Sequence, residues 1–309
     1  MEKTETVPLF VHGVEKTGTS TLVGILNSHP EVFVLYETML DNCRISKYGN
    51  QLLEEFPEAR VLFRKTTNIA EPYLKLAKMI QRKNPGYNYR YIGDKLISLD
   101  PARTQPEVPH KTIYTFRDAR TWLPKGQIVK YYRTDLDLVA PAVEYLRYII
   151  SSFQYRNSMH VRLNDIVFRN QDLLAALSDY LGLSIIEYAD QWWQTAGSYP
   201  KDDPKRLFKW FIGHHSSKVQ PKELDTSVVL QQVPFWEEYL PLFDKYFRTG
   251  FFPEFSAEEI NQDLISLDGL LAHAPLPLHQ AYQKIETDIL GPEKSRLDTV
   301  KQRLKGYFR

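Results

Sequence analysis

Short apolar segments alternate with longer amphipathic segments along roughly the first 190 residues of the chain. The apolar segments are of strand length, and several are rich in β-branched and aromatic residues, which favour strands. Continuous apolar runs of this length are typical of strands that are buried on both faces. The predicted strands cover residues 9–11, 32–35, 89–92, 112–116 and 159–163.

Between these strands, apolar residues recur at helical spacing, as Leu22, Val23, Ile25 and Leu26 do. Pro30 ends this first helix, because proline lacks an amide hydrogen and disfavours helix in the residue before it. Gly182 is expected to cap the last helix. Strands that alternate with helices predict an α/β fold, a central parallel sheet flanked by helices. The predicted helices cover residues 21–28, 72–83, 136–153 and 171–180.

Beyond about residue 190 the strand pattern fades, and aromatic helices separated by prolines take its place. These helices are predicted at residues 235–247, 258–272 and 279–304. We expect residues 1–255 to form one α/β domain, and residues 256–309 to form a helical extension packed on it.

Composition excludes several classes of protein. The 309 residues carry 39 Lys and Arg against 38 Asp and Glu, a formal net charge of +1, whereas an electrostatic nucleic-acid binder usually has a large basic excess. One cysteine, Cys43, permits no internal disulfide and no cysteine-rich metal site. No apolar run approaches the length of a membrane span, and the polar N-terminus is unlike a signal peptide, so a cytoplasmic protein is expected.

The strand at residues 9–11 runs into a loop rich in glycine and hydroxyl groups, which leads directly into a helix. From Gly13 the chain reads Gly-Val-Glu-Lys-Thr-Gly-Thr-Ser-Thr-Leu. A strand, loop and helix in this order direct backbone amides and the positive helix end at an anion, which predicts a P-loop-like phosphate site. The loop departs from the nucleoside-triphosphate pattern Gly-x-x-x-x-Gly-Lys-Ser/Thr, because Thr19 occupies the lysine position and the lysine stands earlier, at Lys16.

Residues 16–22 resemble the 5′-phosphosulfate loop of sulfotransferases, which use 3′-phosphoadenosine 5′-phosphosulfate (PAPS) as donor. The sequence Ser-His-Pro-Glu-Val at residues 28–32, followed by Glu37, is similar to the Golgi-type and tyrosylprotein members, in which His-Pro precedes a catalytic glutamate. The resemblance implies that Glu37 is the general base. It also implies a donor-binding loop made of Lys16, Thr17, Gly18, Thr19, Ser20 and Thr21.

PAPS carries phosphate groups at both ends of its adenosine, so a second basic segment is expected after a later strand. Arg117 follows the strand at residues 112–116 and resembles the arginine of the family's 3′-phosphate segment. Its planar guanidinium suits an oxyanion. The family's serine, eight positions further on, is replaced here by Lys125, which implies a point-charge contact instead. A surface ion pair of Arg117 with Asp118 or a neighbouring residue is the alternative interpretation.

The segment Ile92-Gly93-Asp94-Lys95 resembles the family's Gly-Glu/Asp-Lys sequence, which implies that Lys95 lies near the transferred sulfuryl group. Residues 161–165 and 181–183 extend the resemblance, which spans residues 8–185 in all. The implied reaction transfers the sulfuryl group of PAPS to a hydroxyl of a small molecule, lipid or saccharide. It releases adenosine 3′,5′-bisphosphate, with Glu37, Lys16 and Lys95 as catalytic residues and no metal.

Other readings of the same residues remain open. A P-loop kinase or nucleotide-triphosphatase shares the strand-loop-helix element, and a catalytically silent nucleotide-binding protein could share the whole scaffold. Glu37 could be a surface carboxylate at the end of its strand, and Lys95 could form a structural ion pair with Asp94 or another acid. Residues 201–220 lie where some sulfotransferases have a lid over the donor, but Lys205 and its charged neighbours are read as a solvated face.

Aromatic residues make up 13% of the chain, and many lie after the donor-binding half. Core packing of helices is the first explanation for them. A ring-lined acceptor pocket is the second, because a nearly neutral chain disfavours a highly anionic polymer as acceptor. The residues concerned are Trp192, Trp193, Phe208, Trp210, Phe211, Phe235, Trp236, Tyr246, Phe247, Phe251 and Phe252.

Overall fold

A computed structural model describes residues 5–40, 45–66, 68–123, 139–168, 170–189, 203–208 and 236–272 of the chain. Within these ranges five parallel strands form one sheet, in the order β2-β3-β1-β4-β5. The predicted α/β fold with a central parallel sheet is therefore confirmed. The strands are β1 (Val7–Gly13), β2 (Val32–Tyr36), β3 (Tyr91–Ile97), β4 (Lys111–Phe116) and β5 (Ser158–Arg162).

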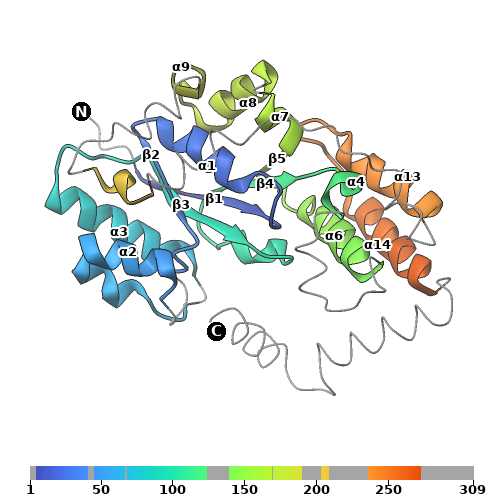
Figure 1. The fold of residues 1–309 in the computed structure, drawn as a ribbon, viewed down its shortest axis with the longest axis horizontal. Coiled ribbons are helices and arrows are strands. Elements are labelled where there is room, and N and C mark those ends of the chain that lie inside the picture. Colours follow the sequence, from blue (N-terminus) through green and yellow to red (C-terminus); the bar gives the residue numbers. More distant parts are fainter. Residues whose placement is uncertain are drawn as a thin grey trace.

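Helices flank the sheet on both sides (Figure 1). One side carries α1 (Thr19–Ser28), α7 (Leu163–Val167), α8 (Gln171–Leu181) and α9 (Ile185–Ala189). The other side carries α2 (Lys47–Glu55) and α3 (Ala70–Lys83). Three 3₁₀ turns complete this part: η1 (Pro57–Leu62), η2 (Pro101–Thr104) and η3 (Pro204–Phe208).

A third group of helices lies beside β4 and β5 (Figure 1). It contains α4 (Ala119–Trp122), α6 (Val139–Ser152), α13 (Trp236–Phe247) and α14 (Ala257–Ala272), and both α13 and α14 pack on α6. The predicted helix at 279–304 lies outside the described residues. No helix in the described part of the chain has both the length and the apolar character that crossing a bilayer requires.

Aromatic rings fill the core between β4 and these helices. Tyr145, Tyr239 and Tyr246 are almost completely buried there, and Phe153 lies between Tyr246 and the strand residue Phe116. Tyr246, which was a candidate for an acceptor pocket, is thus a core residue. Buried rings of this size dominate the hydrophobic stabilisation of a core, so the aromatic share of the chain is in part a packing feature.

Strand β3 differs from its predicted span. The sequence predicts a strand at residues 89–92, whereas β3 continues to Ile97 and contains Gly93, Asp94 and Lys95. These three residue types are poor strand formers, but β3 lies between β1 and β2 and pairs with both. A Cβ atom at Gly93 would lie 1.9 Å from the carbonyl oxygen of Leu9, so only glycine permits this approach of β1.

The segment at residues 203–208 also differs from its expectation. Lys205 is not on a solvated face, since it is only 2% exposed. Its Nζ donates to the carbonyl oxygens of Asn27 (3.1 Å) and His29 (2.6 Å), which lie at the C-terminal end of helix α1. Helix α1 has ten residues and is about 15 Å long. Residues 203–208 therefore lie at the end of α1 opposite the glycine-rich loop, and they are not a lid over it.

Replacing Gly93 with alanine should destabilise the protein severely, by about 3 kcal/mol or more, because the new methyl group overlaps the backbone of β1. Gly269→Ala is the matched control. A Cβ at Gly269 meets nothing within 4 Å, and alanine inside α14 should leave stability unchanged or raise it by up to about 1 kcal/mol. Urea unfolding measures both variants, and equal midpoints would contradict the close approach of β1 and β3.

Stability should also depend on the buried lysine. Burial lowers the pKa of Lys205 from 10.5 to about 7. Between these values the unfolded chain binds a proton that the folded chain does not, so the free energy of unfolding rises with pH. The slope reaches up to about 1.4 kcal/mol per pH unit. Lys205→Met should flatten the stability profile between pH 7 and 9, whereas Lys78→Met, on the exposed face of α3, should keep the wild-type slope. Identical slopes in all three proteins would contradict a neutral Lys205.

Candidate active site

Four neighbouring strands bring the candidate residues to one edge of the sheet. Strands β2, β3, β1 and β4 are adjacent and parallel, so their carboxyl ends lie together. The glycine-rich loop follows β1, Glu37 follows β2, Lys95 lies near the end of β3, and Arg117 follows β4. In open α/β sheets ligands bind outside this edge. Residues that are far apart in the sequence therefore meet where a ligand is expected.

The start of helix α1 has no side-chain cap and no acidic side chain in its first turn. Gly18 occupies the N-cap with a φ of 97°. The amide of Leu22 donates to the carbonyl of Gly18 (3.0 Å), so the amides of residues 19–21 precede the hydrogen-bonded helix. These amides and the positive helix end favour a negative group.

Thr17 stabilises the glycine-rich loop through bonds within the loop and to β4. Its hydroxyl donates to the carbonyl oxygen of Val14 (2.7 Å) and lies 2.7 Å from the hydroxyl of Thr115, which belongs to β4. Its amide also bonds to Val14 (3.3 Å). A Cβ at Gly13 would lie 2.2 Å from Thr115 Oγ1, so the loop packs tightly on β4. Of the candidate loop residues, Thr17 thus has its amide and hydroxyl directed inward, whereas Lys16 is exposed.

Lys95 contacts both Glu37, which follows β2, and the start of helix α1. Its Nζ forms an ion pair with Oε1 of Glu37 (2.6 Å) and donates to Oγ of Ser20 in the first turn of α1 (3.1 Å). The side chain of Lys95 is 3% exposed, whereas that of Glu37 is 26% exposed. A carboxylate, an ammonium group and the glycine-rich loop therefore lie together, and the carboxylate is partly exposed.

Asp94 holds the backbone next to Glu37. Because side chains alternate along a strand, Asp94 lies on the face of β3 opposite Lys95. Its Oδ2 accepts hydrogen bonds from the hydroxyl of Thr38 (2.7 Å), the amide of Met39 (2.9 Å) and the hydroxyl of Tyr73 (3.0 Å). The ion pair that Lys95 forms is thus with another acid, Glu37. Had β3 been predicted at its full length, the alternation of side chains along a strand would have placed Asp94 and Lys95 on opposite faces from the sequence alone.

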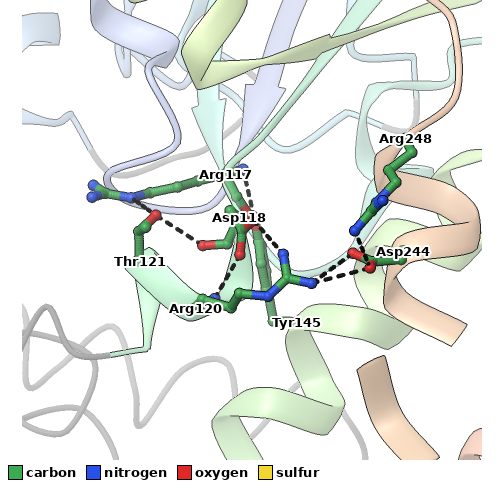
Figure 2. Close-up of polar contacts among 7 residues, drawn as sticks. All are labelled: Arg117, Asp118, Arg120, Thr121, Tyr145, Asp244 and Arg248. Atoms are coloured by element: carbon green, nitrogen blue, oxygen red, sulfur yellow. Dashed lines mark hydrogen bonds and ion pairs between the residues drawn. The ribbon is translucent and has the colours of Figure 1, made fainter. Parts of the chain in front are cut away.

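Arg117 reaches the loop from the other side. Its Nη1 donates to the carbonyl oxygen of Lys16 (3.5 Å), and burial lowers the pKa of its guanidinium, which still stays charged at neutral pH. Asp118, the alternative partner of Arg117, instead accepts from Arg120 (Nη1 to Oδ2, 2.7 Å), as Figure 2 shows. Lys125, the other residue of the predicted 3′-phosphate segment, lies outside the described residues.

The late segment of the resemblance also packs on the loop. A Cβ at Gly18 would lie 2.7 Å from Leu163 and 3.1 Å from Ile166, both in α7. Gly182 ends α8 in the left-handed conformation, with a φ of 61°, as the sequence predicts. The segment after β5 therefore packs against the glycine-rich loop at Gly18.

Comparison with known proteins gives limited information. No family model matches the chain, and no curated protein matches it. Among solved structures, it is similar to the sulfotransferase domain of the Synechococcus PCC 7002 olefin synthase, with 15% identity over 89% of this chain and 98% of that one. The TM-score of this pair is 0.42. A similarity at this level leaves the activity to be inferred from the residues of the chain itself.

Proposed function

We propose that this protein is a sulfotransferase that transfers the sulfuryl group of PAPS to the hydroxyl of an acceptor. One observation carries the proposal. The Lys95 ammonium lies 2.6 Å from the Glu37 carboxylate and 3.1 Å from Ser20 in the anion-binding loop. Transfer of a sulfuryl group to a hydroxyl needs an anion site, a cation at the transferred group and a base, and this site contains all three side by side.

The residues at the sheet edge fit the donor. PAPS, when bound, supplies the activated sulfuryl group and leaves as adenosine 3′,5′-bisphosphate. The amides of residues 18–21 and the exposed Lys16 suit its 5′-phosphate, since the helix end is uncapped and free of acids in its first turn. Arg117, on the other side of the loop, suits the 3′-phosphate. Lys125 is proposed to assist Arg117 as a point charge.

Glu37 and Lys95 divide the chemistry between them. The half-buried Glu37 carboxylate accepts the proton of the acceptor hydroxyl, which makes the oxygen nucleophilic. Lys95 stabilises negative charge on the sulfuryl oxygens, and its burial strengthens this interaction because little water screens it. A carboxylate base favours a hydroxyl acceptor over a protonated amine, so we infer that the acceptor is an alcohol or phenol of a small molecule, lipid or saccharide.

Calorimetric titration tests the donor. Adenosine 3′,5′-bisphosphate should bind without magnesium, and ATP with magnesium should bind more weakly. Glu37→Gln should keep the affinity for the bisphosphate within about twofold, but should lower sulfuryl transfer from labelled PAPS to a panel of phenols, alcohols and saccharides by about 10²- to 10⁴-fold. Glu31→Gln, at the opposite end of β2, is the control and should keep both properties. Preferred binding of magnesium-ATP would instead indicate a kinase or nucleotide-triphosphatase.

Lys16→Ala tests the loop separately. Because a lysine-phosphate contact is charge-assisted, its loss should weaken binding of the bisphosphate at least about tenfold. Lys78→Ala removes an equally exposed lysine from α3 and should leave the affinity unchanged. If both variants bound like the wild type, the assignment of Lys16 to the donor would be wrong.

A further inference from the structure

The turn that carries Arg117 is tied to the C-terminal helices by a chain of charges. Arg120 lies between two carboxylates: its Nη1 donates to Asp118, and its Nη2 donates to both oxygens of Asp244 on α13 (2.9 and 3.1 Å). Arg248 also donates to Asp244 (2.7 Å). Figure 2 shows this alternation of acid and base between α4 and α13. Arg120 thus bridges the two acids through different nitrogens, Nη1 to Asp118 and Nη2 to Asp244, and these charge-assisted bonds restrain its side chain.

Arg117 is itself held at both its backbone and its side chain. The hydroxyl of Tyr145 accepts from the amide of Arg117 and donates to its carbonyl oxygen, at 2.7 Å in each case. Nε of Arg117 donates to the hydroxyl of Thr121 (2.8 Å), which donates onward to the carbonyl oxygen of Asp118 (3.0 Å). The single proton of each hydroxyl suffices for these bonds. The Nε edge of the guanidinium is thus held by Thr121 (Figure 2). Its Nη1 donates to the carbonyl oxygen of Lys16 in the loop.

We propose, resting on the function proposed above, that Thr121 and Asp244 are positioning residues of the donor site. Thr121 orients the Arg117 guanidinium toward the 3′-phosphate. Asp244 orients the Arg120 guanidinium, whose Nη1 bonds one oxygen of the Asp118 carboxylate while the Arg120 amide bonds the other, so that this carboxylate is held by Arg120 rather than by Arg117. A long side chain that is ordered in advance loses less rotamer freedom on binding, and this lowers the cost of binding.

The direction in which Asp244→Asn changes the affinity for the bisphosphate distinguishes a positioning role from a purely electrostatic one. Asp244→Asn removes a negative charge near an anion site, which by Coulomb's law alone leaves anion binding unchanged or makes it tighter. Positioning predicts the opposite result, weaker binding, because Arg120 loses one of its two charged partners and is held less firmly beside Asp118. Asp263→Asn is the matched control. Asp263 bonds Lys245 and Tyr246 where α13 meets α14, and no contact links it to Arg117 in the described part of the chain.

The experiment compares the affinities of adenosine 3′,5′-bisphosphate and adenosine 5′-phosphate by calorimetry. Thr121→Val should weaken the bisphosphate about three- to tenfold and leave adenosine 5′-phosphate unchanged, so that the preference for the 3′-phosphate narrows. Thr121→Ser, which restores the hydroxyl, should restore the preference. Asp244→Asn should also reduce the preference for the bisphosphate over adenosine 5′-phosphate, and Asp263→Asn should leave this preference unchanged. Thermal unfolding of each variant shows whether the fold is retained.

Each outcome has a distinct meaning. If the wild-type protein does not bind the bisphosphate, the proposed function itself fails. If it binds but does not prefer the bisphosphate to adenosine 5′-phosphate, or if Thr121→Val keeps the preference, the positioning inference is overturned and the function stands. Unchanged or tighter binding of the bisphosphate by Asp244→Asn would overturn the role of Asp244.

Discussion

The candidate site depends on the interactions of the buried Lys95 ammonium group with Glu37 and Ser20. A charge that is 3% exposed must have partners, because an unpaired charge in the interior is strongly destabilising. Its partners come from two separate segments, Glu37 after β2 and Ser20 in α1. Strand β3 therefore determines where the carboxylate stands relative to the anion-binding loop. The position of Lys95 is in turn fixed by its pairing with Val11 of β1 and Tyr36 of β2.

Backbone strain in the described residues is concentrated at the same two segments. The non-glycine residues with a positive φ there are Lys16 (68°), Glu37 (48°) and Met39 (55°). This conformation costs about 1–2 kcal/mol per residue and persists only where the surroundings enforce it. Asp94 enforces it after β2, through its bonds to residues 38 and 39. Two of the three strained residues, Glu37 and Lys16, are candidate catalytic residues that the sequence singles out, and strain of this kind clusters at functional sites.

The sequence predicts the fold and the members of the site, but not the contacts that join them. The periodicity of apolar residues predicts the strand centres and most helices. The glycine-rich loop can also be predicted, because the residues that form it are consecutive in the sequence. The extent of β3 is missed, since Gly93, Asp94 and Lys95 are in a strand only because β1 and β2 enclose them. Lys205 is misread for the same reason: its carbonyl partners lie more than 170 positions earlier in the chain.

A net charge of +1 indicates little about where positive potential lies, because at physiological salt charges act over roughly 8 Å. What matters is which charges compensate each other locally. At the end of β4, Asp118 and Asp244 are matched by Arg120 and Arg248 in one chain of contacts. The pairing leaves Arg117 directed at the loop that carries Lys16 and the positive end of α1. A nearly neutral protein can thus present a local anion site, provided that its acids are held by other bases, and helix α13 supplies the acid that completes this arrangement.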